Sequence, residues 1–313
     1  MLGHVARTLL RVLVTGIGIV TVAFFLMRSI PGDPATTMLG DYATKESVAT
    51  LRAKLGLDEP LWRQYAMFIA DAASGNLGTS VVTGQPALAQ VLSSLPPSAA
   101  LALAGLAIAI AIGIPLGIIS AIRQGTWIDV TVMTVALAGI SFPVFWVGLA
   151  GILVFAYWIP LFPALGSSSA TDFFTQAHHV MLPAIVLGLS TAAYIARLTR
   201  SAMLEILSQD YIRVARAMGV RERSVIYKLA LRNAMVPILA VIGVTFAWSF
   251  GNAILIEAVF SRPGLGSMLL KAIQARDYQL VQAGVLVLAS IVVLINAALD
   301  LSYGFVDPRL RAS

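Results

Sequence analysis

Six apolar stretches, separated by polar or charged segments, follow one another along the chain. A helix needs about 20 apolar residues to cross the hydrocarbon core of a membrane, and each stretch approaches or exceeds that length. The predicted spans are Val12–Met27, Ser98–Ile122, Val130–Ile159, Val180–Ala196, Ala234–Ile256 and Tyr278–Leu299. The pattern therefore predicts an all-α integral membrane protein with six transmembrane helices.

The third stretch is long and is interrupted by Ser141-Phe142-Pro143. Proline lacks a backbone N–H and clashes with the preceding helical turn. We therefore expect a kink near the middle of this span.

Two polar segments are too long to be simple connections. In segment 31–97, Thr44–Leu55 and Leu61–Ala72 have helical apolar spacing, which predicts a small external helical cap. We divide the chain into residues 1–30 with the first span, a cap at 31–97, and a core with the other five spans at 98–313. The core includes a basic cytoplasmic loop at about 199–233.

Composition excludes a soluble globular protein. Hydrophobic residues make up 58% of the chain and charged residues 12%, against roughly 25% charged in ordinary soluble domains. The net charge is +6. Because Lys and Arg are enriched in the loops on the side of the N-terminus, the positive-inside rule places both termini in the cytoplasm.

The chain lacks the usual signatures of catalysis and energy conversion. It has no cysteine, no lysine that follows a glycine as in a P-loop, and no H-E-x-x-H or G-x-S-x-G motif. His178 and His179 are adjacent, so their side chains diverge by about 100° on a helix, and we predict no metal site. No acidic residue lies deep in a predicted span, which argues against a buried proton relay. We expect a passive path that another protein drives.

The cytoplasmic loop contains a short helix, a glycine turn and a second helix. Tyr211, Val214 and Met218 form an apolar stripe at helical spacing, and Gly219 fits the left-handed position after a helix. A second helical pattern begins near Arg221 and runs to Pro237. The residues alone leave two interpretations: an element that docks in a partner's groove, or a basic linker on anionic lipid.

This loop resembles the EAA loop of ATP-binding-cassette importer permeases, and in particular the dipeptide/oligopeptide/nickel family of first permease subunits. The matching residues are Asp210-Tyr-Ile-Arg-Val-Ala-Arg-Ala-Met-Gly219, Ala230-Leu-Arg-Asn-Ala234 and Pro237. Arg213, Val214 and Arg232 depart from the general EAA pattern, which favours the peptide branch. Further segments match in family order, including Ile30–Pro34, Gly75–Ser80, Ile114–Gly117, Glu257–Gly266 and Asp277-Tyr278.

The resemblance implies a type I importer permease fold in the bacterial cytoplasmic (inner) membrane. It also implies four kinds of partner: a homologous second permease, two P-loop ATPase subunits, an extracytoplasmic substrate-binding protein and membrane lipid, with no nucleic acid. The chain would bind no cofactor itself, because ATP and Mg²⁺ would act on the ATPases. The expected cargo is di- or oligopeptides, with nickel, glutathione or another small solute as alternatives. A self-sufficient channel or secondary transporter should show inverted repeats or buried ionisable groups, and neither is visible.

Three sets of candidate site residues follow. The resemblance assigns ATPase coupling to Tyr211, Arg213, Ala215, Arg216, Ala217, Gly219, Arg221 and Arg223. Interrupted helices and polar residues in spans suggest a translocation path near Ser141, Phe142, Pro143, Trp146, Trp248, Ser249, Asn252 and Glu257. The cap residues Asp33, Asp41, Asp58 and Glu59 are candidates for contact with the binding protein. The alternatives are lipid-facing arginines, hydrogen bonds between helices and an ordinary solvated loop.

Overall fold

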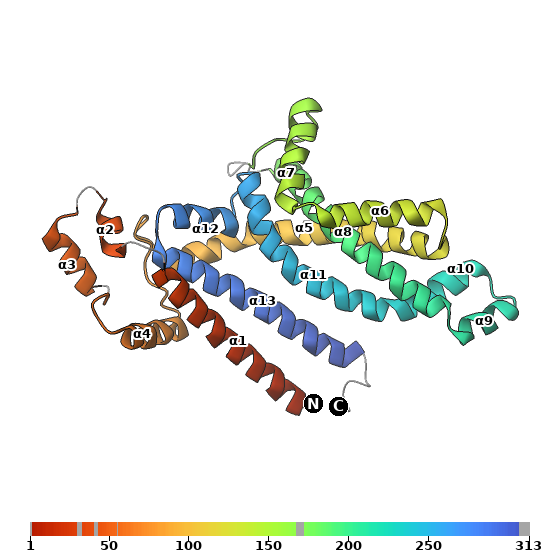
Figure 1. The fold of residues 1–313 in the computed structure, drawn as a ribbon, viewed down its shortest axis with the longest axis horizontal. Helices are drawn as coiled ribbons and strands as arrows, with labels where there is room; N and C mark the ends of the chain where they lie inside the picture. Colours follow the sequence, from red (N-terminus) through yellow and green to blue (C-terminus); the bar gives the residue numbers. More distant parts are fainter. Residues whose placement is uncertain (1, 30–32, 41–42, 55, 167–171, 307–313) are drawn as a thin grey trace. The chain divides into compact units, whose positions relative to one another are not determined.

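The computed structural model describes residues 2–29, 33–40, 43–54, 56–166 and 172–306. Within these residues the fold is helical, as predicted, and an isolated bridge between Thr79 and Pro86 is the only β-type pairing (Figure 1).

The N-terminal helices are α1 (Leu2–Ser29), α2 (Pro34–Leu39), α3 (Lys45–Lys54), α4 (Leu61–Ser74) and α5 (Ala87–Ile122). The middle of the chain forms α6 (Trp127–Ser141), α7 (Val144–Ile152), a π-helical segment η2 (Leu153–Trp158), and α8 (Phe173–Leu207). The remaining elements are α9 (Asp210–Ala217), α10 (Glu222–Ser224), π-helical η3 (Val225–Ala230), α11 (Leu231–Val259), α12 (Leu265–Gln274) and α13 (Tyr278–Val306).

Four continuous helical stretches are long and apolar enough to cross a membrane, and they contain four of the predicted spans: Ala87–Ile122, Phe174–Leu207, Glu222–Val259 and Tyr278–Leu299. The helices extend beyond the apolar stretches, because charge marks where a helix leaves lipid and not where it ends. In α1 the described apolar segment is the shorter Leu13–Val22.

The third predicted span is broken much more sharply than a kink. The helices α6 and α7–η2 meet at 99°. Phe142 has φ −83° and ψ 133°, and Pro143 has ψ 135°, so both residues are extended. A proline ring disfavours helical geometry at the residue before it. Phe142 is extended and ends α6, whereas α8 and α11 continue through Pro183 and Pro237.

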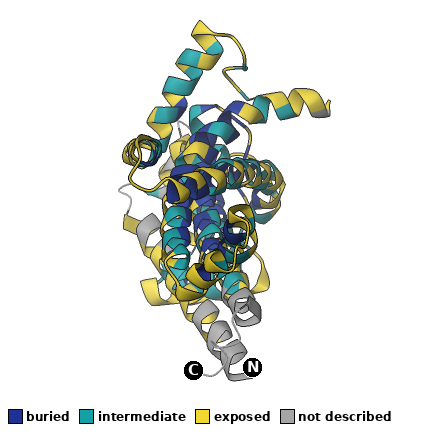
Figure 2. Cartoon of the chain, turned by 90° about the vertical axis from the view of Figure 1, so that its right-hand side faces the viewer, coloured by how far each residue is buried: buried dark blue, intermediate teal, exposed yellow. Residues whose placement is uncertain are grey.

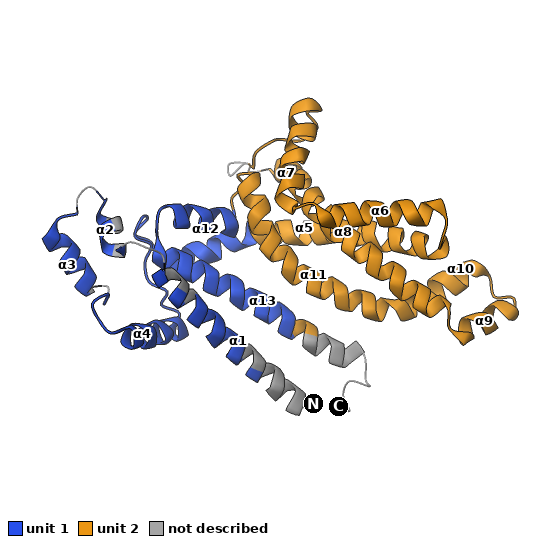
Figure 3. Cartoon of the chain, viewed as in Figure 1, with its two compact units in different colours: residues 1–97, 264–297 blue, residues 98–263, 298–313 orange. Residues whose placement is uncertain are grey.

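The chain divides into two compact units (Figure 3). The first contains residues 1–97 and 264–297, and the second contains residues 98–263 and 298–313. The division at residue 97 coincides with the end of the predicted cap. Segment 264–297 groups with the N-terminal residues, although the sequence places it in the core.

In the first unit, α4 of the cap is attached to the end of α1. Arg28 donates to the Gln64 side-chain oxygen from Nε (3.0 Å) and Nη2 (2.7 Å). The Gln64 amide nitrogen donates to the carbonyl oxygens of Leu57 (3.1 Å) and Glu59 (2.7 Å). One nearly buried amide therefore joins the end of α1 to the turn before α4.

In the second unit, α5 and α8 approach closely at glycines. A Cβ at Gly117 would lie 2.6 Å from the Ala196 carbonyl oxygen, and one at Gly113 would lie 2.8 Å from that of Ala192. Close approach at small residues is typical of helix packing in membranes.

Buried and exposed positions alternate along the helices (Figure 2). Many exposed side chains are large and apolar, among them Leu103, Val135 and Trp158. A surface of this kind suits contact with lipid or with other membrane helices.

Candidate functional site

The turn after α9 has the predicted geometry. Gly219 has φ +79°. Its N–H donates to the carbonyl of Arg216 (3.0 Å), and the N–H of Val220 donates to the carbonyl of Ala215 (3.1 Å). These two bonds form a Schellman motif, which requires a left-handed residue at the glycine position. The prediction of a glycine-capped helix is confirmed.

The apolar stripe on α9 faces outward. Val214 is 56% exposed and Met218 78%, and Tyr211 is also exposed. The side chain that anchors α9 is Ile212, which is 0% exposed and which the sequence did not single out. It packs in a cluster with Met203 of α8 and other buried residues. Ile212 thus supplies the buried apolar anchor of α9, while the stripe on the opposite side is exposed.

The first two arginines of the coupling set have partners within the loop. Arg213 pairs with Asp210, and Arg216 pairs with Glu222 at 2.7 Å. The hydrogen bond to Glu222 raises the pKa of the Arg216 guanidinium above its ordinary value. Pairing with an ATPase carboxylate would have to compete with these internal bonds.

The other residues of the coupling set differ in exposure. Ala217, Arg221 and Arg223 are exposed, whereas Ala215 is half-buried. Tyr211 accepts a hydrogen bond from the Asn233 amide at 2.8 Å. This bond joins α9 to α11, so the two helices of the loop form one helix-turn-helix element.

Four path candidates lie together at the break between α6 and α7. The rings of Phe142 and Trp146 stack with centroids 4.9 Å apart, and both are exposed. Pro143 and Ser141 are exposed as well, and the Ser141 hydroxyl donates to the Leu137 carbonyl of its own helix. The break thus presents an aromatic pair and extended backbone at the surface of this unit.

The path candidates on α11, which the sequence analysis groups in one path, do not share one face. Trp248 is 70% exposed and Asn252 is half-buried, but Glu257 is 0% exposed and Ser249 is also buried. At 3.6 residues per turn, position 257 lies about 180° from position 248. The Ser249 hydroxyl donates to the Thr245 carbonyl of its own helix. Ser249 and Glu257 therefore face the interior of the second unit.

Glu257 lies beside a buried arginine at the end of α11. The N–H of Arg262 donates to the Glu257 carbonyl at 2.9 Å. Burial lowers the pKa of the Arg262 guanidinium, and the charge of Glu257 opposes that shift. A Cβ at Gly166 would lie 2.7 Å from the Arg262 Cα. The matched Glu257–Gly266 segment thus begins in a closely packed, charged corner.

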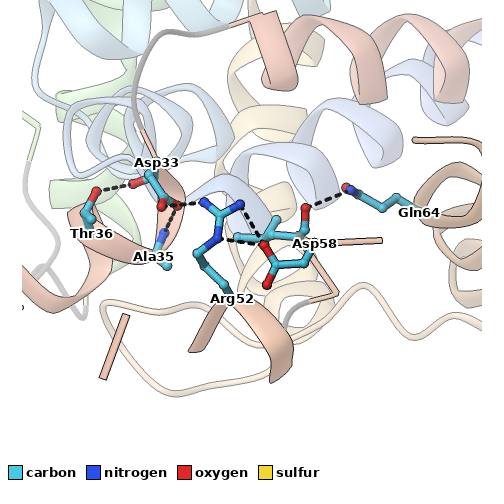
Figure 4. A network of polar contacts seen from close by, with 7 residues as sticks. Asp33, Ala35, Thr36, Arg52, Asp58 and Gln64 are labelled. Carbon is cyan, nitrogen blue, oxygen red and sulfur yellow. Dashed lines mark hydrogen bonds and ion pairs between the residues drawn. The ribbon is translucent and has the colours of Figure 1, made fainter. Parts of the chain in front are cut away.

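Two of the cap carboxylates hold the cap together (Figure 4). Arg52 pairs with Asp33 at 2.6 Å and with Asp58 at 2.8 Å. Both carboxylates raise the pKa of Arg52 above its ordinary value. Asp33 also accepts the N–H of Ala35 at 3.0 Å and caps α2. These residues connect α2, α3 and the turn before α4.

The other two binding-protein candidates differ. Glu59 pairs with Arg63 at 2.9 Å, and Asp41 lies outside the described residues. Helices α3 and α4 confirm the two helices predicted in the cap, while α2 was not predicted. Its signal was present in the sequence, because Asp33 followed by Pro34 is a helix start.

The histidine pair supports a loop. The His178 Nε2 lies 2.9 Å from the Leu161 carbonyl oxygen, and the His179 Nδ1 lies 2.9 Å from that of Leu165. Each ring is thus hydrogen-bonded to a different backbone carbonyl of the segment that follows η2.

The sequence also left two buried carboxylates unassigned. Asp277 accepts hydrogen bonds from Ser80 and from the N–H of Leu280. It therefore caps α13 and joins two matched family segments within the first unit. Asp129 is 4% exposed and lies at the start of α6, where it contacts Arg200 of α8. An Asp just before an apolar run is an N-cap signal, but nothing local identifies a partner as distant as Ser80 or Arg200.

Comparison with protein families gives two matches that together span most of the chain. Residues 113–312 match the binding-protein-dependent transport system inner membrane component family. Residues 1–102 match the N-terminal domain of membrane components of the same transport systems. The second match contains the whole predicted cap.

Similar proteins match along the whole length. The dipeptide transport system permease protein DppB of Alkalihalophilus pseudofirmus is 40% identical, over 99% of this chain and 100% of the relative. DppB of Escherichia coli K12 is 39% identical over 99% of both chains. The glutathione transport system permease protein GsiC of Escherichia coli O6:H1 is 36% identical, also over 99% of both. The chain belongs to the family of binding-protein-dependent transport system inner membrane components.

Proposed function

We propose that the chain is one of two permease subunits of an ATP-driven importer, and that it forms half of a path for dipeptides and short peptides. The uncovered apolar stripe on α9, beside a glycine-capped turn, carries this proposal, because it is suited to docking in a partner's groove. The complete transporter also contains a second permease, two P-loop ATPases and an extracytoplasmic binding protein. ATP and Mg²⁺ act on the ATPases.

The route of the driving movement begins at α9. Closure of the ATPases around ATP displaces the docked helix. Ile212, at the centre of a buried cluster with residues of α5, α8 and η3, passes the displacement to the long helices. The transporter then alternates between outward-open and inward-open states, since ATP favours one of them.

The topology in this proposal has six spans and both termini in the cytoplasm. The four long apolar helices, the bent pair α6–α7 and helix α1 support it, as does the Lys and Arg bias. The chain has no cysteine, so single cysteines report sidedness cleanly. A cysteine at Ser208, which is exposed and lies outside the apolar stripe, should react with an impermeant maleimide only after the membrane is opened, and one at Trp62 should react in intact cells.

The peptide cargo is supported by the two dipeptide permeases, which are 40% and 39% identical to the chain. Glutathione is the second candidate, because a glutathione permease is 36% identical over the same length. The path candidates at the break, an aromatic pair and extended backbone, suit a loosely selective passage for peptides of varied sequence.

The test begins with a pull-down of the tagged chain from its own membranes in mild detergent, with mass spectrometry of the proteins recovered. We expect a second permease and two P-loop ATPases. The complex is then reconstituted with its binding protein and offered labelled dialanine, glutathione or nickel. ATP-dependent uptake of dialanine supports the proposal. Uptake of glutathione or nickel without uptake of dialanine would show that the cargo is that solute and not a peptide. Uptake by the chain alone without ATP would refute the proposal. The control is an ATPase whose P-loop lysine is replaced.

A further inference from the structure

An ion pair between the half-buried Arg200 and the buried Asp129 fixes the start of α6 to α8. Arg200 donates to both oxygens of Asp129, from Nε at 2.6 Å and from Nη2 at 2.7 Å. Ser120 of α5 and the N–H of Gly125, at 3.0 Å, donate to the same carboxylate. A bidentate arginine–carboxylate pair is strong and fixes the orientation of both side chains. One side chain thus joins α5, the turn after it, α6 and α8.

Helix α6 otherwise packs along α8, through positions that are mostly only half-buried. Of its residues, all of which are described, only Asp129 and Ala136 are buried. Gly139 approaches Ala193 of α8, while Val130 and Val135 are exposed. Apolar contact alone orients a membrane helix weakly, because lipid is equally apolar. The pair therefore adds a directional, charge-assisted attachment to the apolar packing between α6 and α8.

The arginine of the pair lies on the helix that leads to the coupling element. Helix α8 ends at Leu207, and α9 starts at Asp210. Ile212 of α9 packs with Met203 of α8 and Ile118 of α5. Because α5 and α8 are also in close contact at Gly117, displacing α9 must displace both long helices.

We propose that the Asp129–Arg200 pair makes α6 move with α8 and α9. It would carry the ATPase-driven movement to the break at Ser141–Pro143, where the Phe142–Trp146 aromatic pair lies. Asp129 and Arg200 are positioning residues in this proposal, since they act through α6 and touch no cargo. The inference rests on the proposed function, because an ATPase must act on α9.

The first measurement is the distance between α6 and α8, and it needs no cargo. Spin labels are placed on cysteines at Val135 of α6 and Glu205 of α8, both exposed, in the assembled complex with cysteine-free partners. We expect one narrow distance in the resting and vanadate-trapped states. In Arg200→Gln we expect the trapped state to broaden or shift. In the double variant Asp129→Arg with Arg200→Asp, which swaps the two charges, the distance distribution of the trapped state should be narrow again. An unchanged, narrow distance in Arg200→Gln would overturn the inference.

The second measurement is the number of ATP molecules hydrolysed per dialanine imported. We expect Arg200→Gln to raise this ratio about tenfold, within the usual range of coupling energies. Arg200→Lys, which keeps the positive charge, should bring the ratio part of the way back to the wild-type value. The matched control is Arg197→Gln, an exposed arginine of the same helix, which should leave it unchanged. If Arg200→Gln lowers the rate of ATP hydrolysis and the rate of dialanine uptake by the same factor, the ratio is unchanged. The pair is then merely structural and the inference fails. A wild-type complex that imports no dialanine would instead refute the proposed cargo, and the distance measurement would still decide this inference.

Discussion

The N-terminal cap at 31–97 and the basic loop at about 199–233 both contain short helices, but these are held and exposed in different ways. The cap is held by directional polar bonds: Arg28 to Gln64, and Arg52 to Asp33 and Asp58. The loop is held mainly by buried apolar side chains, Ile212 of α9 with Val225 and Ile226 of η3, and leaves Val214 and Met218 uncovered.

The comparison shows that charged side chains hold the cap together internally, whereas apolar side chains of the loop are left exposed. The cap carboxylates chosen from the sequence as partner contacts are already paired within the cap, apart from Asp41, which is not described. In the apolar stripe, the Tyr211 hydroxyl is bonded to Asn233, but Val214 and Met218 are exposed apolar side chains. Uncovered apolar side chains at a polar end of a membrane protein are thus the stronger indication of a docking surface.

The largest expected effect is on the glycine turn of the loop. A non-glycine residue in the left-handed region costs about 1–2 kcal/mol, and a β-branched one costs more. We expect Gly219→Val to lower ATP-dependent uptake by more than about tenfold, with normal insertion measured as membrane yield. Asparagine tolerates this conformation, so Gly219→Asn should retain most activity. Normal uptake by Gly219→Val would refute the role of the turn.

Next in size is the apolar stripe. We expect Met218→Asp to reduce recovery of the ATPases in the pull-down by about tenfold, since it places a charge in a docked apolar contact. Arg213→Glu should weaken recovery by a smaller factor, because Arg213 is already paired with Asp210. Unchanged recovery with both variants would favour the interpretation that the loop rests on lipid.

A smaller and local effect is expected in the cap. Gln64→Leu removes the amide shared by Arg28 and two carbonyls, at a cost of about 1–3 kcal/mol. Hydrogen exchange over residues 57–64 should become faster, while exchange in α9 stays the same. Gln85→Leu, which removes an exposed amide in the same unit, is the control. Equal protection in Gln64→Leu and the wild type would show that the cap does not depend on this bond.

The smallest effect concerns an exposed ion pair. Such pairs contribute about 0–1 kcal/mol, so Glu59→Gln should change stability little and peptide uptake by less than about twofold. A larger loss of uptake at unchanged stability would revive Glu59 as a contact with the binding protein. That result would weaken the contrast between cap and loop.

Local pattern was enough to predict the long helices, two helices of the cap and several helix ends, but not α2 or α12. Apolar stretches located the spans, proline located the break after Ser141, and glycine located the turn at Gly219. These features are predictable because helix formation, capping and proline geometry depend on residues within about one turn of each other. The family resemblance, carried by the order of short motifs, was likewise readable without coordinates.

The tertiary structure alone decided which faces are buried and which distant charges meet. Trp248 and Glu257 occur in one apolar helix, yet one is exposed and the other is enclosed. Hydropathy cannot distinguish these faces, because lipid and protein interior are both apolar. The pairs Asp129–Arg200 and Ser80–Asp277 join segments far apart in the chain. No local pattern encodes such contacts, since they exist only after the helices have packed.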